Sequence, residues 1–383
     1  MKRSYIARRF QSSGAGLSLD TEALAKYKDI IDLSIGDTDF TTDESIINAA
    51  FRDARAGHTH YGDPKGDPEL IDAVCRAWEE DFGQRLPRDH VLVSASSCLG
   101  MALVMLAILD PGDEVILFSP YFPMYREQIE LAGGVCVDVP TYASEDYAID
   151  EARLRAAITP RTKAIVFNNP TNPTGMGYDG KTLELLARVA QEHDLLIAAD
   201  EIYTTYLYEG DFRPIRTLPG MAERTITLNS FSKNFLMTGW RVGVIIAEPE
   251  LLAVMNRING SLIYSAPSVS QRAAIQALAM RKEIREKYVT AYRDRIFYSA
   301  DRIEKLPYLS LVRPKGTFYL FPGVEKTGLD EKAFCKVLLD QAHVLVSPGT
   351  PFGVSAAGHF RIACTVGIDR LKAAFDRMEK LSF

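Results

Sequence analysis

Seven short apolar segments constrain the fold of this chain more than any other feature of its sequence. They begin at Val91, Glu114, Val135, Lys163, Leu195, Thr225 and Trp240. Most are separated by stretches long enough for a helix, such as 99–109 and 181–192. Near-continuous apolar strands with such spacers indicate an α/β protein with a mostly parallel sheet covered by helices on both faces. The turn at Thr238 is short, which allows the last strand to run antiparallel to its predecessor.

The C-terminal part of the chain has a different pattern. One long helical stretch is predicted from Ser268 to about Leu306, and at a rise of about 1.5 Å per residue it would extend about 55 Å. A helix of this length can bridge two lobes, and short strands and turns follow it. We therefore expect a large domain over 41–269 and a smaller α+β domain formed by 1–40 and 270–383, which includes an N-terminal arm.

Composition and charge narrow the class of function. The chain has 383 residues, 47% of them hydrophobic, which is enough for a full core. Its net charge of −6 is spread over mixed signs, which argues against a nucleic-acid or anionic membrane surface. The five cysteines lie far apart without C-x-x-C spacing, so we expect no disulfide framework, no metal site and a cytoplasmic location. We also expect no signal peptide and no membrane span, because no long apolar run is present.

Polar and aromatic residues recur directly after the predicted strands. In an open parallel sheet, ligands bind beyond the carboxyl ends of the strands, so residues at these exits are candidate site residues. They are Ser96, Ser97, Cys98, Phe122, Asn172, Asp200, Tyr203, Ser230 and Lys233. Each has an ordinary interpretation by itself: a helix cap, a core aromatic, a turn or a solvated lysine. Asp200 stands out because it ends an apolar strand, where a carboxylate is costly unless it meets a cation.

Taken together, these residues suit a phosphorylated pyridine aldehyde, pyridoxal phosphate. Lys233 can form a Schiff base with the aldehyde, and Asp200 can keep the ring nitrogen protonated so that the ring withdraws electrons. A helix N-terminus binds anions, so the backbone at 96–98 can hold the phosphate. The hydroxyl of Ser230 and the planar fork of Arg241 can complete the phosphate site.

The remaining strand exits suit the ring of the same cofactor. Tyr203 and Asn172 can hydrogen-bond the ring oxygen, which keeps the Schiff base electrophilic near neutral pH. The aromatic face of Phe122 can stack on the flat ring. The strand exits thus agree on one cofactor, although each assignment is weak alone.

Several longer motifs carry a resemblance to a known family. They are N-S-F-S-K-N-F-L-M-T-G-W-R-V-G, N-N-P-T-N-P-T-G, A-D-E-I-Y, D-P-G-D-E-V-I-L-F-S-P-Y-F-P and H-F-R-I-A-C. From about Ile31 to its end, the chain resembles the class I and II pyridoxal-phosphate-dependent aminotransferases of the aspartate aminotransferase fold family (fold type I). The resemblance implies a large domain with a mostly parallel seven-stranded sheet, a smaller α+β domain, and a homodimer with shared active sites. Amino acids and 2-oxo acids, both small molecules, are the implied substrates.

The resemblance assigns the same cofactor roles by position and adds others. Phe122 stands where the family often has tryptophan, which predicts weaker stacking. Tyr61, in Y-G-D-P-K-G, matches the tyrosine that reaches the phosphate in the neighbouring subunit. Arg361 matches the arginine that binds the substrate α-carboxylate, assisted by Asn172 and the backbone at Gly36. By itself, Arg361 could equally form a surface ion pair.

Other classes of protein fit the motifs less well. Two motifs match elements of penicillin-binding serine enzymes: S-F-S-K, which ends at Lys233, and K-T-G, which begins at Lys326. The third element of those enzymes is missing, because no S-D-N, S-x-N or Y-x-N lies between the two motifs. A nucleotide-binding dehydrogenase would need a G-x-G-x-x-G after a strand, and none follows. A non-catalytic cofactor-binding module stays open, although the complete residue set favours catalysis.

We predict ping-pong transamination between an L-amino acid and a 2-oxo acid, with Lys233 as the general base. The alternative reaction is β-elimination, as in the related cysteine-S-conjugate β-lyases. The segment I-G-D-T-D-F of this chain distantly resembles the N-terminal pattern of those lyases. Dicarboxylate-specific relatives place a cation where this chain has Ser261 or Cys98, both uncharged. A buried carboxylate without a partner is costly, so we expect neutral or aromatic donors. If the Arg-rich N-terminal arm supplies the cation, the enzyme is instead an aspartate aminotransferase.

Overall fold

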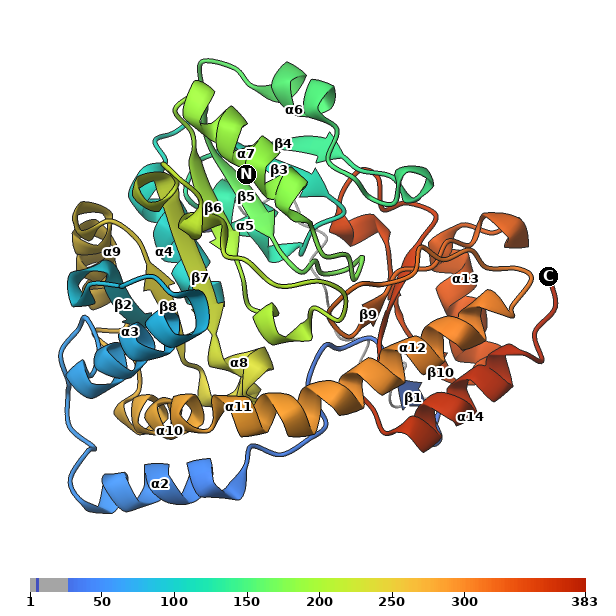
Figure 1. Cartoon of the computed structure of the whole chain (residues 1–383). Helices are drawn as coiled ribbons and strands as arrows, with labels where there is room; N and C mark the ends of the chain where they lie inside the picture. The colour runs from blue at the N-terminus through green and yellow to red at the C-terminus, as the bar shows by residue number, and fades with distance from the viewer. Residues whose placement is uncertain (1–4, 7–26) are drawn as a thin grey trace.

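The computed structural model describes residues 5–6 and 27–383, and its centre is a seven-stranded sheet (Figure 1). In spatial order the strands are β2 (Val91–Ser94), β8 (Gly243–Ile246), β7 (Thr225–Ser230), β6 (Leu196–Asp200), β5 (Thr162–Asn168), β3 (Glu114–Ser119) and β4 (Val135–Pro140). β8 is antiparallel to β2 and β7, and the other neighbouring strands are parallel. The seven predicted strands, the mostly parallel sheet and the antiparallel last strand are confirmed.

Most strands of this sheet are buried, whereas the edge strand β4 is partly exposed. Successive side chains of a strand point to opposite faces, so a buried strand contributes to a core on each side. In β3, Val115 and Leu117 belong to a core on one face, whereas Ile116 and Phe118 belong to a core on the other. The helices in the first core are α4 (Ser97–Ile108), α5 (Met124–Leu131) and α9 (Pro249–Leu262). Those in the second are α6 (Glu151–Ala157) and α7 (Gly180–Glu192). The α/β layering therefore follows from the continuous apolar character of the strands.

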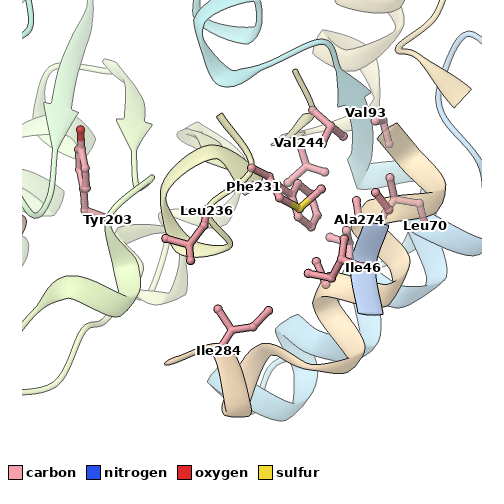
Figure 2. Packing of buried hydrophobic residues seen from close by; sticks show 14 of the residues in the cluster. Ile46, Leu70, Val93, Tyr203, Phe231, Leu236, Val244, Ala274 and Ile284 are labelled. Atoms are coloured by element: carbon pink, nitrogen blue, oxygen red, sulfur yellow. The ribbon is translucent and has the colours of Figure 1, made fainter. Parts of the chain in front are cut away.

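A third core supports the short helix that carries Lys233. Its helices include α2 (Glu44–Arg55), α3 (Pro68–Phe82), α8 (Phe231–Asn234) and α10 (Ser268–Ala279). Figure 2 shows Phe231 of α8 beside Val244 of the sheet, with side chains of α2, α3 and α10 close by. Phe231 and Leu236 lie on either side of Lys233 in the chain, and both are buried. This packing fixes the backbone on which the lysine stands.

The long helical stretch predicted from Ser268 is present but interrupted. It consists of α10, α11 (Arg281–Ile284), a π-helical turn (Arg285–Val289) and α12 (Thr290–Glu304), and it runs along the molecule from the sheet to the second lobe (Figure 1). The prediction of one continuous helix is wrong at Met280, where the backbone leaves helical geometry (φ −101°, ψ 9°) and caps α10. Within the described residues, no helix has both the length and the apolar character needed to cross a membrane.

The second lobe has its own α+β core, built on helices α12, α13 (Glu331–Val337) and α14 (Ile368–Met378). A three-stranded antiparallel sheet contains β11 (Ser347–Pro348), β12 (Phe360–Ala363) and β9 (Tyr319–Leu320), and a parallel pair joins β1 (Ile31–Asp32) to β10 (Val344–Leu345). Strand β1 thus ties residues from near the start of the chain to the C-terminal lobe. The smaller α+β domain is confirmed, while its division from the large domain at residues 40 and 270 stays a prediction.

Candidate active site

A cavity of about 1030 Å³ lies where the carboxyl ends of the parallel strands meet the second lobe. Nearly all of the predicted site residues line it. They are Gly36, Ser96, Ser97, Cys98, Phe122, Asn172, Asp200, Tyr203, Ser230, Lys233, Arg241 and Arg361. These residues span 326 positions of the sequence, from 36 to 361, so the fold gathers what the chain spreads out.

Lys233 stands in the four-residue helix α8, directly after β7. The Ser230 hydroxyl caps this helix by accepting a hydrogen bond from the backbone of Ser232 at 3.1 Å. The Lys233 ammonium donates to the backbone carbonyl of Gly36. A side chain at Gly36 would place its Cβ 1.7 Å from the Tyr319 hydroxyl, so only glycine fits at this contact.

The environment of Lys233 favours its neutral form. Burial is the main cause that lowers the pKa of the amine, to about 8, and the nearby guanidinium groups of Arg361 and Arg241 lower it further, while Asp37 opposes them. A lysine with this pKa has a substantial neutral fraction near physiological pH. It can therefore act as a nucleophile or as a general base.

Asp200 ends β6 and is only 6% exposed. Its Oδ2 accepts a hydrogen bond from the Tyr125 hydroxyl, while its Oδ1 is buried and has no partner among the described residues. Burial raises the pKa of the carboxyl to about 6, and the hydrogen bond from Tyr125 and a weaker one from the Ile202 backbone oppose that shift. A buried acceptor without a donor is costly unless a ligand supplies one. The site therefore fits a ring nitrogen that carries a proton and a positive charge.

Another part of the cavity wall suits a phosphate. Ser96 adopts a left-handed backbone (φ 98°) and caps α4 by accepting from the Leu99 amide at 3.2 Å. Ser97 begins this 12-residue helix, whose free amides favour an anion. A side chain at Gly243 would put its Cβ 2.8 Å from the Ser97 nitrogen, so glycine allows β8 to pass close beneath this turn. Arg241 also has a positive φ (55°) and donates to Thr238 O at 2.7 Å.

Arg361, on β12, forms the wall contributed by the second lobe. It donates to Asn172 Oδ1 at 3.0 Å and to the backbone carbonyl of Ser34 at 2.6 Å. Its Nε is buried without a partner, and the guanidinium lies 4.7 Å from the ring centroid of Tyr319 and 5.0 Å from that of Phe352. The side chain is 4% exposed, and it makes no ion pair with the described residues. The surface ion-pair interpretation of Arg361 is therefore wrong, and the guanidinium retains capacity for a ligand carboxylate.

The sequence did not identify two tyrosines of this cavity, Tyr125 and Tyr319. Tyr125 follows Phe122 by three residues in the first turn of α5, a spacing that could have pointed to the same wall. Tyr319 lies in the second lobe, where its hydroxyl is 3.1 Å from that of Tyr203. No pattern near Tyr319 in the sequence connects it with Tyr203, because only tertiary packing brings the two side chains together.

Tyr61 is the predicted residue that does not line the cavity. It is 87% exposed, and its ring contacts that of Tyr264, with centroids 4.9 Å apart. Its predicted role concerns the phosphate site of a neighbouring subunit. That role stays a prediction.

Comparison with known proteins identifies the family. A family model described as aminotransferase class I and II matches residues 28–378. The chain belongs to this family. The aminotransferase is 37% identical to the aspartate/prephenate aminotransferase of Thermus thermophilus, over 98% of both chains. It is 35% identical to an arginine–pyruvate transaminase of Pseudomonas aeruginosa, over 99% of this chain and 97% of that protein.

A solved structure supports the same assignment. The aromatic aminotransferase of Pyrococcus horikoshii superposes with a TM-score of 0.90 at 34% identity, covering 94% of this chain and 97% of that chain. The aminotransferase is therefore an enzyme of the aspartate aminotransferase fold that uses pyridoxal phosphate and moves amino groups between amino acids and 2-oxo acids. The penicillin-binding and dehydrogenase interpretations are excluded by this family membership.

Proposed function

We propose that this aminotransferase prefers neutral or aromatic L-amino acids as donors and binds donor and acceptor in turn in the same cavity. The observation that carries this proposal is a contrast in charge: the cavity has a buried guanidinium for the α-carboxylate of the substrate but no charge at the two positions considered for a second carboxylate. Arg361 is a buried guanidinium with an unpartnered N–H, suited to the α-carboxylate that every donor has. Cys98, which lines the cavity, and Ser261, whose position would face the cavity of a partner subunit, are both uncharged.

Each cofactor contact has a proposed residue. The phosphate is held by the backbone and hydroxyls at 96–98, by Ser230 and by Arg241, the ring oxygen by Tyr203 and Asn172, and the ring face by Phe122. Asp200 Oδ1, which has no partner within the described chain, would accept from the protonated ring nitrogen. When bound, pyridoxal phosphate supplies an aldehyde that condenses with amines and a protonated ring that withdraws electrons.

Lys233 has two proposed tasks. Its amine anchors the cofactor between turnovers, and during turnover it accepts the proton from Cα of the substrate. A pKa of about 8 matches both tasks, because a base works best when its pKa lies near the operating pH. Arg361, with Asn172 and the backbone at Gly36, orients the α-carboxylate so that the Cα–H bond faces this amine.

Acceptors with a second carboxylate need a further cation, and α13 offers one. One side of α13 and of the π-helical turn after it lines the cavity, because side chains three or four residues apart lie on the same face of a helix. These side chains are Lys332, Cys335, Lys336 and Leu339. Lys336 pairs with Asp340. Lys332 makes no hydrogen bond or ion pair with the described residues, so we propose that it receives the distal carboxylate of dicarboxylic acceptors. Because Lys332 is exposed, such a pair contributes only about 0.2–1 kcal/mol, too little to make aspartate the preferred donor.

We also propose a homodimer with shared active sites. The exposed position of Tyr61, away from the cavity of its own chain, supports this proposal, as do exposed apolar side chains nearby in the sequence or in space. These are Phe51, Leu262, Ile263 and Tyr264. Light scattering on the purified enzyme should give about twice the mass of one chain, and a mass of one chain at micromolar concentration would contradict the dimer.

Half-reactions test the donor preference. The cofactor-loaded enzyme is mixed with single amino acids, and conversion of the cofactor to its amine form is followed by absorbance in a stopped-flow instrument. Neutral and aromatic donors should convert it faster than aspartate at equal concentration. If aspartate converts the cofactor faster than every neutral and aromatic donor, the proposed preference is wrong.

A further inference from the structure

Tyr125 is a buried tyrosine that contacts Asp200 in the proposed cofactor site. It stands in the first turn of α5 and is 3% exposed. Its ring lies edge-on to that of Phe122, with the centroids 5.6 Å apart, and its hydroxyl donates to Asp200 Oδ2. Both Tyr125 and Asp200 line the cavity. One hydrogen bond thus joins the helix after β3 to the end of β6.

The two oxygens of Asp200 are in different situations. Oδ2 is occupied by Tyr125, whereas Oδ1 is buried and unpartnered within the described chain. A carboxylate that accepts a hydrogen bond on one oxygen loses freedom to rotate about its Cβ–Cγ bond. The contact with Tyr125 therefore determines which oxygen stays available to the cavity.

The chemical nature of the donor matters as much as its position. Asp200 forms no ion pair with a lysine, arginine or histidine of the described chain, so its charge is not cancelled by the protein. A phenol orients a carboxylate by donating a hydrogen bond and leaves the negative charge in place, whereas a basic side chain would neutralise it. Burial raises the pKa of the Tyr125 phenol well above its ordinary value, so the hydroxyl stays a donor at every working pH.

We propose that Tyr125 is a positioning residue that holds Asp200 so that Oδ1 faces the pyridine nitrogen with its charge uncompensated. The proton on that nitrogen is then stabilised by a carboxylate oxygen, Oδ1, that accepts no other hydrogen bond within the described chain. The role of Tyr125 rests on the role proposed above for Asp200. It concerns cofactor protonation, which is measurable without turnover.

The test is Tyr125→Phe in the full-length enzyme loaded with pyridoxal phosphate labelled with ¹⁵N in the ring. The substitution keeps the ring that packs against Phe122 and removes only the hydroxyl. The ¹⁵N resonance should move toward the unprotonated position, and equilibrium dialysis should show about 10- to 100-fold weaker cofactor retention, as expected for losing a hydrogen bond to a charged group. An unchanged resonance and unchanged retention would overturn the proposal.

Tyr121→Phe is the matched control. Tyr121 is also buried, its hydroxyl accepts from Arg126 Nε at 2.9 Å, and it is absent from the cavity lining of the described residues. This variant should keep the wild-type ¹⁵N resonance even if it lowers thermal stability. If both variants move the resonance equally, the effect is one of general packing and the proposal is overturned.

A double-mutant cycle separates Tyr125 from Asp200. If Tyr125 acts through the carboxylate, adding Tyr125→Phe to Asp200→Asn should change the ¹⁵N resonance and the retention no further. Full additivity would overturn the proposal. If Asp200→Asn alone leaves the resonance at its wild-type position, the proposed role of Asp200 fails as well. If Asp200→Asn moves it and Tyr125→Phe does not, only the role of Tyr125 fails.

Discussion

The floor and the rim of the cavity differ in burial and in what they control. The floor consists of Asp200, Tyr203 and Lys233, at the ends of β6 and β7, where burial shifts the pKa of every one of these groups. The rim includes Cys98 and Lys332, both exposed. Electrostatic interactions are strong in the low-dielectric floor and weak in water at the rim. We therefore expect the floor to set the rate for all substrates and the rim to set preferences between them.

Lys233→Ala should have the largest effect. The loss of both the anchoring amine and the general base should lower kcat by about four orders of magnitude or more for every donor. The visible absorbance of the covalently held cofactor should also disappear. Steady-state assays and absorbance spectra test this, and Lys332→Ala at the rim should keep the spectrum. Substantial activity in Lys233→Ala would contradict the site assignment.

Asp200→Ala should come next, with about a 100- to 1000-fold slower proton removal from Cα, the range seen when a preorganised electrostatic contact is lost. Substrate affinity should change much less, because the proposed partner of Asp200 is the cofactor ring and not the substrate. Single-turnover measurements over a range of donor concentrations separate the rate from the binding constant. A wild-type rate at saturation would argue against the pairing with the ring nitrogen.

The same carboxylate should reduce the stability of the cofactor-free protein. Its pKa is raised from 3.8 to about 6, so the folded state holds the proton more tightly than the unfolded state. The stability that this group contributes at low pH is lost as the pH rises from about 4 to 6, by about 3 kcal/mol. The Asp200→Asn variant should not lose this stability as the pH rises, because its amide does not ionise.

Thermal unfolding of the cofactor-free proteins between pH 4 and 8 tests this expectation. Wild type and Asp200→Asn should differ little at pH 4, and the variant should be the more stable above pH 6. Glu184→Gln is a suitable control, because Glu184 is an exposed carboxylate on α7. Parallel pH profiles for wild type and Asp200→Asn would show that the buried carboxylate is compensated in the absence of the cofactor.

Cys98→Lys should alter the rim selectively. It adds a cation at a position that lines the cavity and is uncharged in this chain, so aspartate should convert the cofactor about 10-fold faster while the rates for phenylalanine and alanine should change little. Stopped-flow rates for these donors measure the ratio. A uniform change for all donors would mean that this position acts on the cofactor phosphate and does not discriminate between donors.

Lys332→Ala should have the smallest effect. Exposed ion pairs contribute about 0.2–1 kcal/mol, so KM for a dicarboxylic acceptor should rise about 2- to 5-fold and KM for pyruvate should stay constant. The increase should also shrink at high salt. Lys336→Ala is the matched control on the same helix, because Lys336 already pairs with Asp340. If Lys332→Ala raises KM equally for the dicarboxylic acceptor and for pyruvate, Lys332 does not recognise the distal carboxylate.

The sequence alone determined the strand pattern, the cofactor chemistry and the family. These follow from local patterns, because apolar segments of fixed spacing specify the sheet and the residues at their ends necessarily meet at one edge. For that reason the meeting of Lys233, Asp200 and the turn at 96–98 in one cavity could be predicted from short motifs. The break in the long helix at Met280 could not, because it depends on one residue's backbone angles.

Only the tertiary structure decided which partners these residues have. Tyr125 lies 75 residues from Asp200 in the sequence, and Arg361 lies 189 residues from Asn172 and 327 from Ser34. The cavity face of α13 likewise reaches the site only because the second lobe packs across the strand ends. Contacts over such separations are set by how cores pack against one another, and no local pattern encodes them. The type of chemistry could therefore be predicted from the residues at the strand ends, whereas the contacts that orient each charged group could be identified only in the folded structure.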